Sequence, residues 1–245
     1  MKCVIMCGGF AKRMAPIANG TPKALLPVAG KPVIQYIIDR LGPIGEVEKI
    51  LISTNKRFEG QFRDFLSGCK PCKGMELVVE PALSEGEKLG SIGALRFLIE
   101  RGGIDDDLMV INGDNLFKFG LRGFVDFYKA RGGTVVGVYD VRKIDEAKKL
   151  GIVEIDKSKR IVGFEEKPEK PKSTLASTGI YIYPKNILKL ILEYLKQGNS
   201  PDAPGYFLAW LYRRQPVYGF VFREQWFDIG SPETYREAEM GFGSR

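Results

Sequence analysis

The chain of 245 residues contains no histidine, and this absence excludes several kinds of active site. Ser-His-Asp and Cys-His catalysis both need an imidazole as proton acceptor, and many zinc centres need it as a ligand. Catalysis must therefore rely on carboxylates, Lys, Arg, Tyr, backbone dipoles or an ion that is bound through oxygen atoms. Phosphoryl and nucleotidyl transfer fit this restriction, because they depend mainly on positioning and on electrostatics around Mg²⁺.

Cysteine is also scarce, with four residues in the whole chain. Cys69 and Cys72 form a single C-x-x-C, whereas a structural zinc site would need two further ligands. Cys3 and Cys7 fall within or at the end of an apolar, strand-like run, where cysteine acts as a small hydrophobe. A surface thiol pair or a local disulfide at Cys69 and Cys72 is therefore favoured over a zinc site. The cysteine usage is typical of a cytoplasmic protein.

Long hydrophobic runs are missing, since no apolar stretch approaches the roughly 18 residues that cross a bilayer. A strand-like run begins at Lys2, so we expect no signal peptide, no membrane association and a cytoplasmic location. The net charge is +7, which suits an anionic ligand. Because the basic residues are interleaved with acidic ones along the chain, we expect no nucleic acid partner.

The first half of the chain alternates strand-like and helix-like stretches. Four such pairs predict a mostly parallel sheet covered by helices on both faces, with ligands at the carboxyl ends of its strands. The predicted strands cover residues 2–6, 49–53, 76–79 and 107–111, and the predicted helices cover 32–41, 58–66, 89–100 and 120–130.

The second half is richer in strands separated by short turns. With 44% hydrophobic residues and no linker, the chain is expected to form a single domain, 1–245, with halves 1–130 and 131–245. A terminal helix is expected to open at Ser231, which suits the N-cap. The other predicted strands are 134–141, 152–155, 161–164, 178–183 and 216–222, and the other predicted helices are 185–196 and 206–212.

Paired glycines follow the first strand, at Gly8 and Gly9. Glycine lets the backbone approach a ligand closely, and N–H groups in such a turn can point together at phosphate oxygens. Lys12, Arg13 and Lys23 place positive charge around the same segment. These residues indicate a site for a phosphorylated, nucleotide-like ligand.

Two aspartates and an acidic–basic pair add further chemistry. Asp114 follows an apolar strand, and Asp228 precedes the terminal helix. Mg²⁺ is usually held by one or two carboxylates, with substrate phosphates completing its shell. Glu166 and Lys167 combine a carboxylate, which accepts hydrogen bonds from vicinal hydroxyls, with an ammonium group that suits a phosphate.

Six motifs, in the same order and over nearly the whole chain, resemble those of the sugar-1-phosphate nucleotidyltransferases, or nucleotide-sugar pyrophosphorylases. The phosphate loop of that family reads roughly G-G-x-G-[TS]-R, and this chain departs from it at Ala11 and Lys12. The resemblance implies a Rossmann-like, mostly parallel mixed sheet in a single α/β domain of the glycosyltransferase-A-like nucleotidyltransferase fold.

The resemblance also implies roles for individual residues. Arg13 would contact the leaving pyrophosphate, and Lys23 the phosphate charge during transfer. Asp114 and Asp228 would bind Mg²⁺ as the cofactor. The implied nucleotide-binding residues are Gly8, Gly9, Lys12, Glu80, Gly90 and Ser91, and the implied sugar-phosphate-binding residues are Gly151, Glu166, Lys167, Thr178 and Gly179.

The implied reaction joins an NTP to a sugar-1-phosphate, giving an NDP-sugar and pyrophosphate. Glucose-1-phosphate with dTTP or UTP is the expected substrate pair, and a mannose- or heptose-1-phosphate guanylyltransferase is the alternative. Some members of such families are regulatory, nucleotide-sugar-sensing subunits of the same fold. The presence of Arg13, Lys23, Asp114 and Asp228 together favours an enzyme over a regulatory subunit. The sequence is also compatible with a homo-oligomer.

Overall fold

The computed structural model describes residues 1–69 and 74–243, so the Cys69–Cys72 prediction falls partly outside the described residues. The chain divides into two compact units. Unit 1 contains Met1–Leu89, Ile111–Lys118 and a C-terminal segment that starts at Gln225. Unit 2 contains Gly90–Val110 and Phe119–Glu224.

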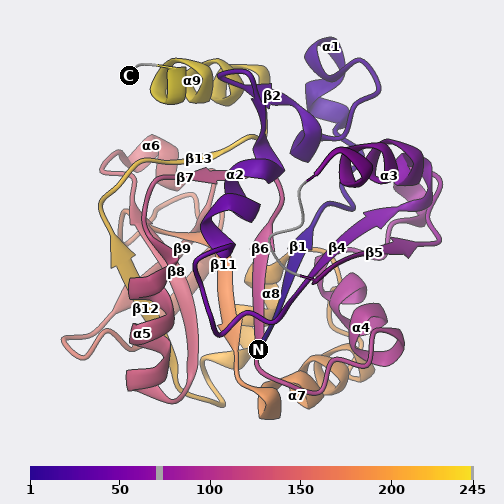
Figure 1. The fold of residues 1–245 in the computed structure, drawn as a ribbon. Coiled ribbons are helices and arrows are strands. Elements are labelled where there is room, and N and C mark those ends of the chain that lie inside the picture. Colours follow the sequence, from indigo (N-terminus) through magenta and orange to yellow (C-terminus); the bar gives the residue numbers. More distant parts are fainter. Residues whose placement is uncertain (70–73, 244–245) are drawn as a thin grey trace. The chain divides into compact units, whose positions relative to one another are not determined.

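Three parallel strands form the sheet of unit 1: β1 (Lys2–Met6), β4 (Lys49–Asn55) and β5 (Gly74–Glu80). They lie side by side in Figure 1, with β4 between the other two. Each was predicted, and β4 and β5 are longer than expected. Their shared direction brings the ends of all three strands to one edge of the sheet, where the Gly8–Gly9 turn follows β1.

Helix α2 (Val33–Leu41) shows why the apolar spacing of this segment predicts a helix. Residues three and four positions apart share one face, and that face is buried. The next helix, α3 (Glu59–Gly68), packs against β4 and β5. The buried residues of α2 are Val33, Ile34, Ile37, Ile38 and Leu41.

Helix α9 (Pro232–Gly243) begins where the sequence predicts it. The Ser231 hydroxyl accepts a hydrogen bond from the Thr234 amide at 3.4 Å, which satisfies an otherwise unpaired donor of the first turn. A hydrogen bond with the Ser231 side chain lowers the pKa of Glu233. The cap fixes the point at which the chain leaves the segment around Asp228.

Unit 1 also contains short elements that the sequence did not predict. Two ribbons of paired strands are β2 with β3, and β7 with β13. The bounds are β2 (Pro27–Val28), β3 (Lys31–Pro32), β7 (Asn115–Phe117), β13 (Trp226–Asp228), α1 (Ala15–Ala18), and the 3-10 helices η1 (Lys12–Met14), η2 (Lys23–Leu25), η3 (Lys56–Phe58) and η4 (Glu85–Glu87).

Unit 2 contains a mixed group of five strands. Strand β8 pairs in parallel with β12 and antiparallel with β11, and β9 pairs antiparallel with β10 and β11. Helix α5 packs on β8 and β12, and α8 packs on β10. The bounds are β8 (Thr134–Asp140), β9 (Gly151–Ile155), β10 (Ile161–Glu166), β11 (Leu175–Tyr183), β12 (Val217–Phe222), α4 (Ser91–Arg101), α5 (Leu121–Arg131), α6 (Ile144–Ala147), α7 (Lys185–Lys196) and α8 (Pro204–Leu211).

Strand β6 (Leu108–Asn112) belongs to both units, since its first three residues lie in unit 2 and its last two in unit 1. Its apolar residues are buried, as predicted for an internal strand. Asp114 therefore follows the end of a buried strand. Among the described helices, none combines the length and apolarity needed to cross a membrane.

Candidate active site

Asp114 and Asp228 lie beside each other although more than a hundred residues separate them in the chain. In the β7–β13 ribbon, Asp228 is the partner of Asn115, and the Ile229 amide donates to the Asp114 carbonyl at 2.9 Å. The Trp226 indole N–H donates to the buried Asn115 side chain and locks the ribbon further. The ribbon thus brings two carboxylates into one site.

Lys23 joins the carboxylates from the 3-10 helix η2. Its Nζ donates to Asp114 Oδ2 at 2.9 Å, and only 17% of the Lys23 side chain is exposed. Burial acts to lower the pKa of Lys23, but attraction to Asp114 and then to Asp228 outweighs it and leaves this pKa above its ordinary value. Lys23 therefore carries a positive charge in the site throughout the neutral pH range.

Arg13 reaches the same site from the phosphate loop. A Cβ placed on Gly230 would lie 3.7 Å from Arg13 Nη2 and 3.8 Å from Asp228 Oδ2. A guanidinium nitrogen and a carboxylate oxygen thus border one open point above Gly230. The structure therefore brings together the four residues predicted to be catalytic, all within unit 1, while their individual roles stay predictions.

The phosphate loop rests on buried polar side chains. The Asn55 amide donates to the Gly8 carbonyl at 3.1 Å, and its oxygen accepts from the Phe58 amide at 3.2 Å. Glu80 is 3% exposed and accepts from the Ser53 hydroxyl at 2.7 Å. Burial raises the pKa of Glu80, against the smaller effect of Ser53. Sequence reasoning missed Asn55, whose only signal is a polar residue at the end of an apolar strand.

Gly8 is tightly constrained by Glu80, since a Cβ on this glycine would lie 3.0 Å from Glu80 Oε1. Ala11 occupies the position where the related loops carry a third glycine. Its φ is +53°, in the left-handed region that glycine adopts more easily. The loop thus keeps a glycine-like backbone at Ala11 despite the methyl group.

The turn between β6 and β7 packs directly on the end of β1. The Gly113 amide donates to the Met6 carbonyl at 2.8 Å. A Cβ on Gly113 would overlap the Cys7 sulfur and lie 3.0 Å from Met6 O. Burial raises the pKa of the Cys7 thiol, and the nearby charges of Asp114 and Glu80 raise it further. This close packing fixes the position of Asp114 relative to the phosphate loop.

The residues predicted to bind the sugar phosphate lie in unit 2. Glu166 ends strand β10, and a Cβ on Gly151 would lie 2.9 Å from its Oε2, while one on Gly205 would overlap that oxygen. Burial raises the pKa of Glu166, against attraction from Lys167. Both glycines leave room for this carboxylate, and Gly205, at the start of α8, was not predicted.

Thr178 and Gly179 shape the same region through backbone contacts. The Thr178 hydroxyl is buried and donates to the Gly137 carbonyl at 2.9 Å, so its side chain supports the strand pairing of β11 with β8. Gly179 has a φ of +74°. Lys167, with a φ of +47°, donates its amide to the Leu150 carbonyl at 3.0 Å, which anchors the turn after β10.

Gly90 and Ser91 begin helix α4, also in unit 2. Gly90 has a φ of +74°, and a Cβ there would lie 2.5 Å from the Pro201 carbonyl oxygen. The Ser91 amide donates to the Asp202 carbonyl at 2.8 Å. Packing against Pro201 and Asp202 is thus sufficient reason for a glycine at position 90.

Asp114 and Asp228 are the side chains of this site that could hold a metal ion. Within the described residues, no group of three or more His, Cys, Asp or Glu side chains is placed to hold a metal. Asp114 and Asp228 supply two carboxylates, which are hard oxygen donors. This set fits Mg²⁺, which is commonly held by one or two carboxylates with phosphate oxygens and water in its other positions.

Known proteins are similar to this chain in sequence and in fold. Residues 2–244 match the family model described as nucleotidyl transferase. The chain is 28% identical over 253 residues to UTP–glucose-1-phosphate uridylyltransferase of Synechocystis sp., covering 100% of this chain and 64% of that protein. It is 29% identical over 241 residues to mannose-1-phosphate guanylyltransferase 1 of Arabidopsis thaliana, covering 96% and 63%. The chain thus spans less than two thirds of the length of these curated relatives.

A solved structure from Bacillus anthracis, named as a glucose-1-phosphate thymidylyltransferase in complex with a sucrose, superposes with a TM-score of 0.84. The two chains are 27% identical, and the match covers 100% of this chain and 96% of the other. The predicted α/β fold with a mostly parallel mixed sheet is thereby confirmed.

Proposed function

The chain belongs to the nucleotidyl transferase family, and on this premise we propose that it transfers a nucleotidyl group from an NTP to a sugar-1-phosphate. The observation that carries the proposal is the convergence of Arg13, Lys23, Asp114 and Asp228 in unit 1. Two cations and two carboxylates that interact within one part of unit 1 suit a polyphosphate and its ion. No histidine is needed, which agrees with the composition of the chain.

In the proposed reaction, an oxygen of the sugar phosphate attacks the α-phosphorus of the NTP in line. The new P–O bond forms as the bond from the α-phosphorus to the bridging oxygen breaks, and pyrophosphate leaves on the opposite side. Lys23 stabilises negative charge that spreads over the transferring phosphate, and Arg13 stabilises the charge on the pyrophosphate. No covalent intermediate with the protein forms.

Asp114 and Asp228 are the residues that would hold Mg²⁺, which would supply further charge neutralisation at the phosphates. Asp114 has a second function in this arrangement, since its hydrogen bond holds the Lys23 ammonium within the site. The raised pKa of Lys23 keeps this side chain cationic. The charges needed for transfer are therefore in position before substrate binds.

The sugar phosphate would be held by unit 2. Glu166 accepts hydrogen bonds from sugar hydroxyls, and Lys167 pairs with the phosphate. The constrained turn at Lys167 supports this role, because a left-handed backbone and an anchored amide define the direction in which the side chain leaves. The glycines at 151 and 205 support it as well, since larger residues would displace the Glu166 carboxylate.

The preferred substrates of this proposal are glucose-1-phosphate with dTTP or UTP, and the alternative is a mannose- or heptose-1-phosphate guanylyltransferase. The names of the related proteins span uridylyl, guanylyl and thymidylyl transfer, so relatedness favours the reaction more strongly than any one base.

A pyrophosphate-release screen tests the proposal. The purified chain is offered dTTP, UTP, GTP and CTP with Mg²⁺, each against glucose-, mannose- and N-acetylglucosamine-1-phosphate. At least one pair is expected to release pyrophosphate and form the matching NDP-sugar. Binding of a nucleotide sugar without pyrophosphate release from any pair would instead indicate a regulatory, sensing subunit.

A further inference from the structure

Helix α9 holds the β2–β3 hairpin through two of its side chains, and Figure 1 shows the helix beside β2. The Tyr235 hydroxyl donates to the Pro27 carbonyl, and the Ala29 amide donates to Glu239 Oε1 at 3.1 Å. Burial raises the pKa of Tyr235, and the charge and hydrogen bond of Glu239 raise it further, so this hydroxyl stays protonated at neutral pH. The first strand of the hairpin and its turn are therefore both fastened to α9.

The backbone of this hairpin has little freedom of its own. Ala29 and Gly30 both lie in the left-handed region, with φ of +48° and +78°, as a tight two-residue turn between paired strands requires. The Tyr36 hydroxyl of α2 donates to the Val28 carbonyl at 2.8 Å, and the Val28 side chain is fully buried. Three successive residues, 27–29, thus each bind a side chain of another element through their backbone.

The hairpin follows directly on the 3-10 helix η2, which carries Lys23. The Leu26 amide donates to the Lys23 carbonyl at 3.1 Å, and the Val33 amide donates to the Leu26 carbonyl at 3.1 Å. Leu26 thus joins the turn of Lys23 to the start of α2, and the next residue is Pro27, which Tyr235 holds. The place of the Lys23 backbone, and with it the reach of its ammonium group into the site, therefore depends on the hairpin.

The same helix is joined at both ends to the ribbon that carries the two carboxylates. Asp228 ends β13, and the Ser231 cap of α9 follows it closely. Near the other end of the helix, the Lys118 ammonium group, just after β7, donates to the Gly241 carbonyl at 2.9 Å. Tyr235 and the rest of the hairpin contact lie between these two points. Helix α9 therefore links the position of Asp228 to that of the hairpin.

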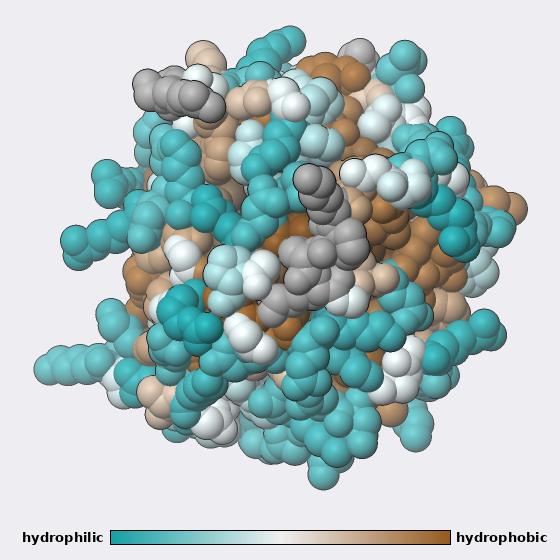
Figure 2. All heavy atoms as spheres, in the orientation of Figure 1, coloured by the Kyte–Doolittle hydropathy of each residue, from teal (hydrophilic) through white to brown (hydrophobic). Residues whose placement is uncertain are grey.

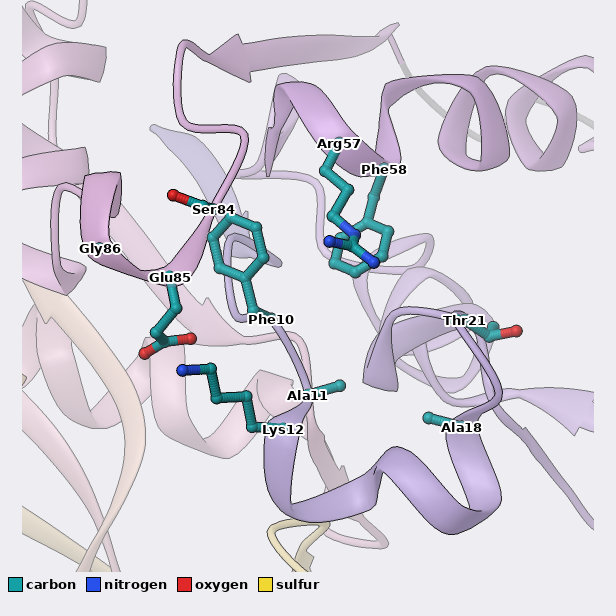
Figure 3. A pocket seen from close by; sticks show the side chains of 11 residues that line it. Phe10, Ala11, Lys12, Ala18, Thr21, Arg57, Phe58, Ser84, Glu85 and Gly86 are labelled. Atoms are coloured by element: carbon teal, nitrogen blue, oxygen red, sulfur yellow. The ribbon is translucent and has the colours of Figure 1, made fainter.

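The core behind this helix also supports the phosphate loop. Buried Ala238 of α9 belongs to one apolar cluster with Leu26 and Val28 and with Ala11 and Met14 of the loop segment. Ala11 also lines a cavity of about 450 Å³ (Figure 3). Because the loop faces open space there, packing against the core of α9 is what supports it.

We infer that Tyr235 and Glu239 are positioning residues for nucleotidyl transfer, which hold Lys23 where it stabilises the transferring phosphate. The inference rests on the proposed function and adds the terminal helix to it. Lys23 acts on charge that develops during transfer, so its misplacement should lower the turnover number, kcat, and change the KM of either substrate little. A helix that served stability alone would leave the kcat of the folded chain unchanged.

The test is steady-state pyrophosphate release by the full chain, with the substrate pair that the pyrophosphate-release screen identifies. Glu239→Ala removes the acceptor of the Ala29 amide, whereas Glu239→Gln keeps one. Tyr235→Phe combined with Glu239→Ala should lower kcat about tenfold, less than the roughly 10²–10³-fold loss expected when a stabilising group is itself removed. Glu239→Gln should restore most of kcat, and Glu237→Ala, at an exposed position of α9, is the matched control.

Lys23→Gln separates positioning from general stability, with thermal midpoints showing that each variant is folded at the assay temperature. In this background, adding Tyr235→Phe and Glu239→Ala should lower kcat less than about twofold further, because the group that they position is already gone. A full tenfold further loss, or an unchanged kcat when Lys23 is present, would overturn the inference and leave the proposed reaction intact. Absence of pyrophosphate release from the unmodified chain would overturn the proposed function and this inference with it.

Discussion

At the residue scale, the catalytic cluster is a balance of two cations and two carboxylates in which each side chain depends on the others. Asp114 is engaged by Lys23 at 2.9 Å, whereas Asp228 shares the space above Gly230 with Arg13. The backbone hydrogen bonds that hold the two aspartates side by side do not involve their carboxylates. A substitution can therefore remove the carboxylate charge of one of these aspartates without breaking the backbone hydrogen bonds that hold the two residues side by side.

Asp228→Asn is expected to fold and to lose activity. The β7–β13 pairing is made by the backbone and should survive, while the loss of one carboxylate should lower turnover by about 10²–10³-fold. Pyrophosphate release and the thermal midpoint measure the two effects. Asp126→Asn, on the exposed face of α5, is the control. Near-normal turnover by Asp228→Asn would contradict the role proposed for this residue.

Glu80 gives a prediction for pH dependence. Burial raises its pKa in the folded chain above the ordinary value of about 4.3, so the folded state binds this proton more tightly than the unfolded state. The free energy of unfolding of the unmodified chain should therefore fall as the pH rises from the pKa of Glu80 in the unfolded state through its raised pKa in the folded state. Glu80→Gln lacks that titration and keeps an acceptor for Ser53.

The measurement is the free energy of unfolding in urea at pH 4 and pH 7. The stability of Glu80→Gln, relative to the unmodified chain, should rise between the two values. Glu76→Gln, on the same strand with half its side chain exposed, provides the reference. The same stability difference for Glu80→Gln at both pH values would show that this carboxylate does not titrate as proposed.

At the element scale, the strands and helices with clear apolar periods were predictable, and the short pairings that build the site were not. The sequence predicts β1 and α2 closely, because consecutive or regularly spaced apolar residues report burial directly. The three-residue strands β7 and β13 are too short to show a period, and their pairing joins distant segments. The resemblance, rather than any pattern in the residues, indicated that Asp114 and Asp228 meet.

The packing of the β6–β7 turn on β1 yields a prediction about Gly113. In Gly113→Ala the new methyl group overlaps the Cys7 sulfur, so we expect the free energy of unfolding to fall by about 1–3 kcal/mol. Gly60→Ala is the matched control, since Gly60 lies in α3 with open space around it, and this change should stabilise the chain slightly.

Urea unfolding of both variants gives these values. Adding Cys7→Ala to Gly113→Ala should restore part of the loss, because it removes the overlapping sulfur. An unchanged stability in Gly113→Ala would mean that the turn can move away from β1, and the tight positioning of Asp114 would then lose its support.

At the scale of the whole molecule, the residues proposed to act on the transferring phosphates and those proposed to hold the sugar phosphate belong to different units, although Gly90 and Ser91, expected at the nucleotide, belong to unit 2. Arg13, Lys23, Asp114 and Asp228 all belong to unit 1, and the chain segments of unit 2 contain Glu166 and Lys167. Hydrophilic side chains are spread over the face shown in Figure 2, in keeping with basic and acidic residues that alternate along the sequence. Specificity for an anionic ligand must therefore come from local clusters rather than from the net charge of +7.

This division predicts separable effects on the two substrates. Lys167→Met should raise the KM for the sugar-1-phosphate at least about tenfold, because it removes one charged hydrogen bond, and should leave the affinity for the NTP unchanged. Arg13→Gln should do the reverse and weaken NTP binding. Steady-state pyrophosphate release gives the KM values, and calorimetry gives NTP binding by each variant. Lys172→Met, in the exposed loop after β10, is the matched control for Lys167. Equal effects of Lys167→Met on both substrates would show that unit 2 does not hold the sugar phosphate independently.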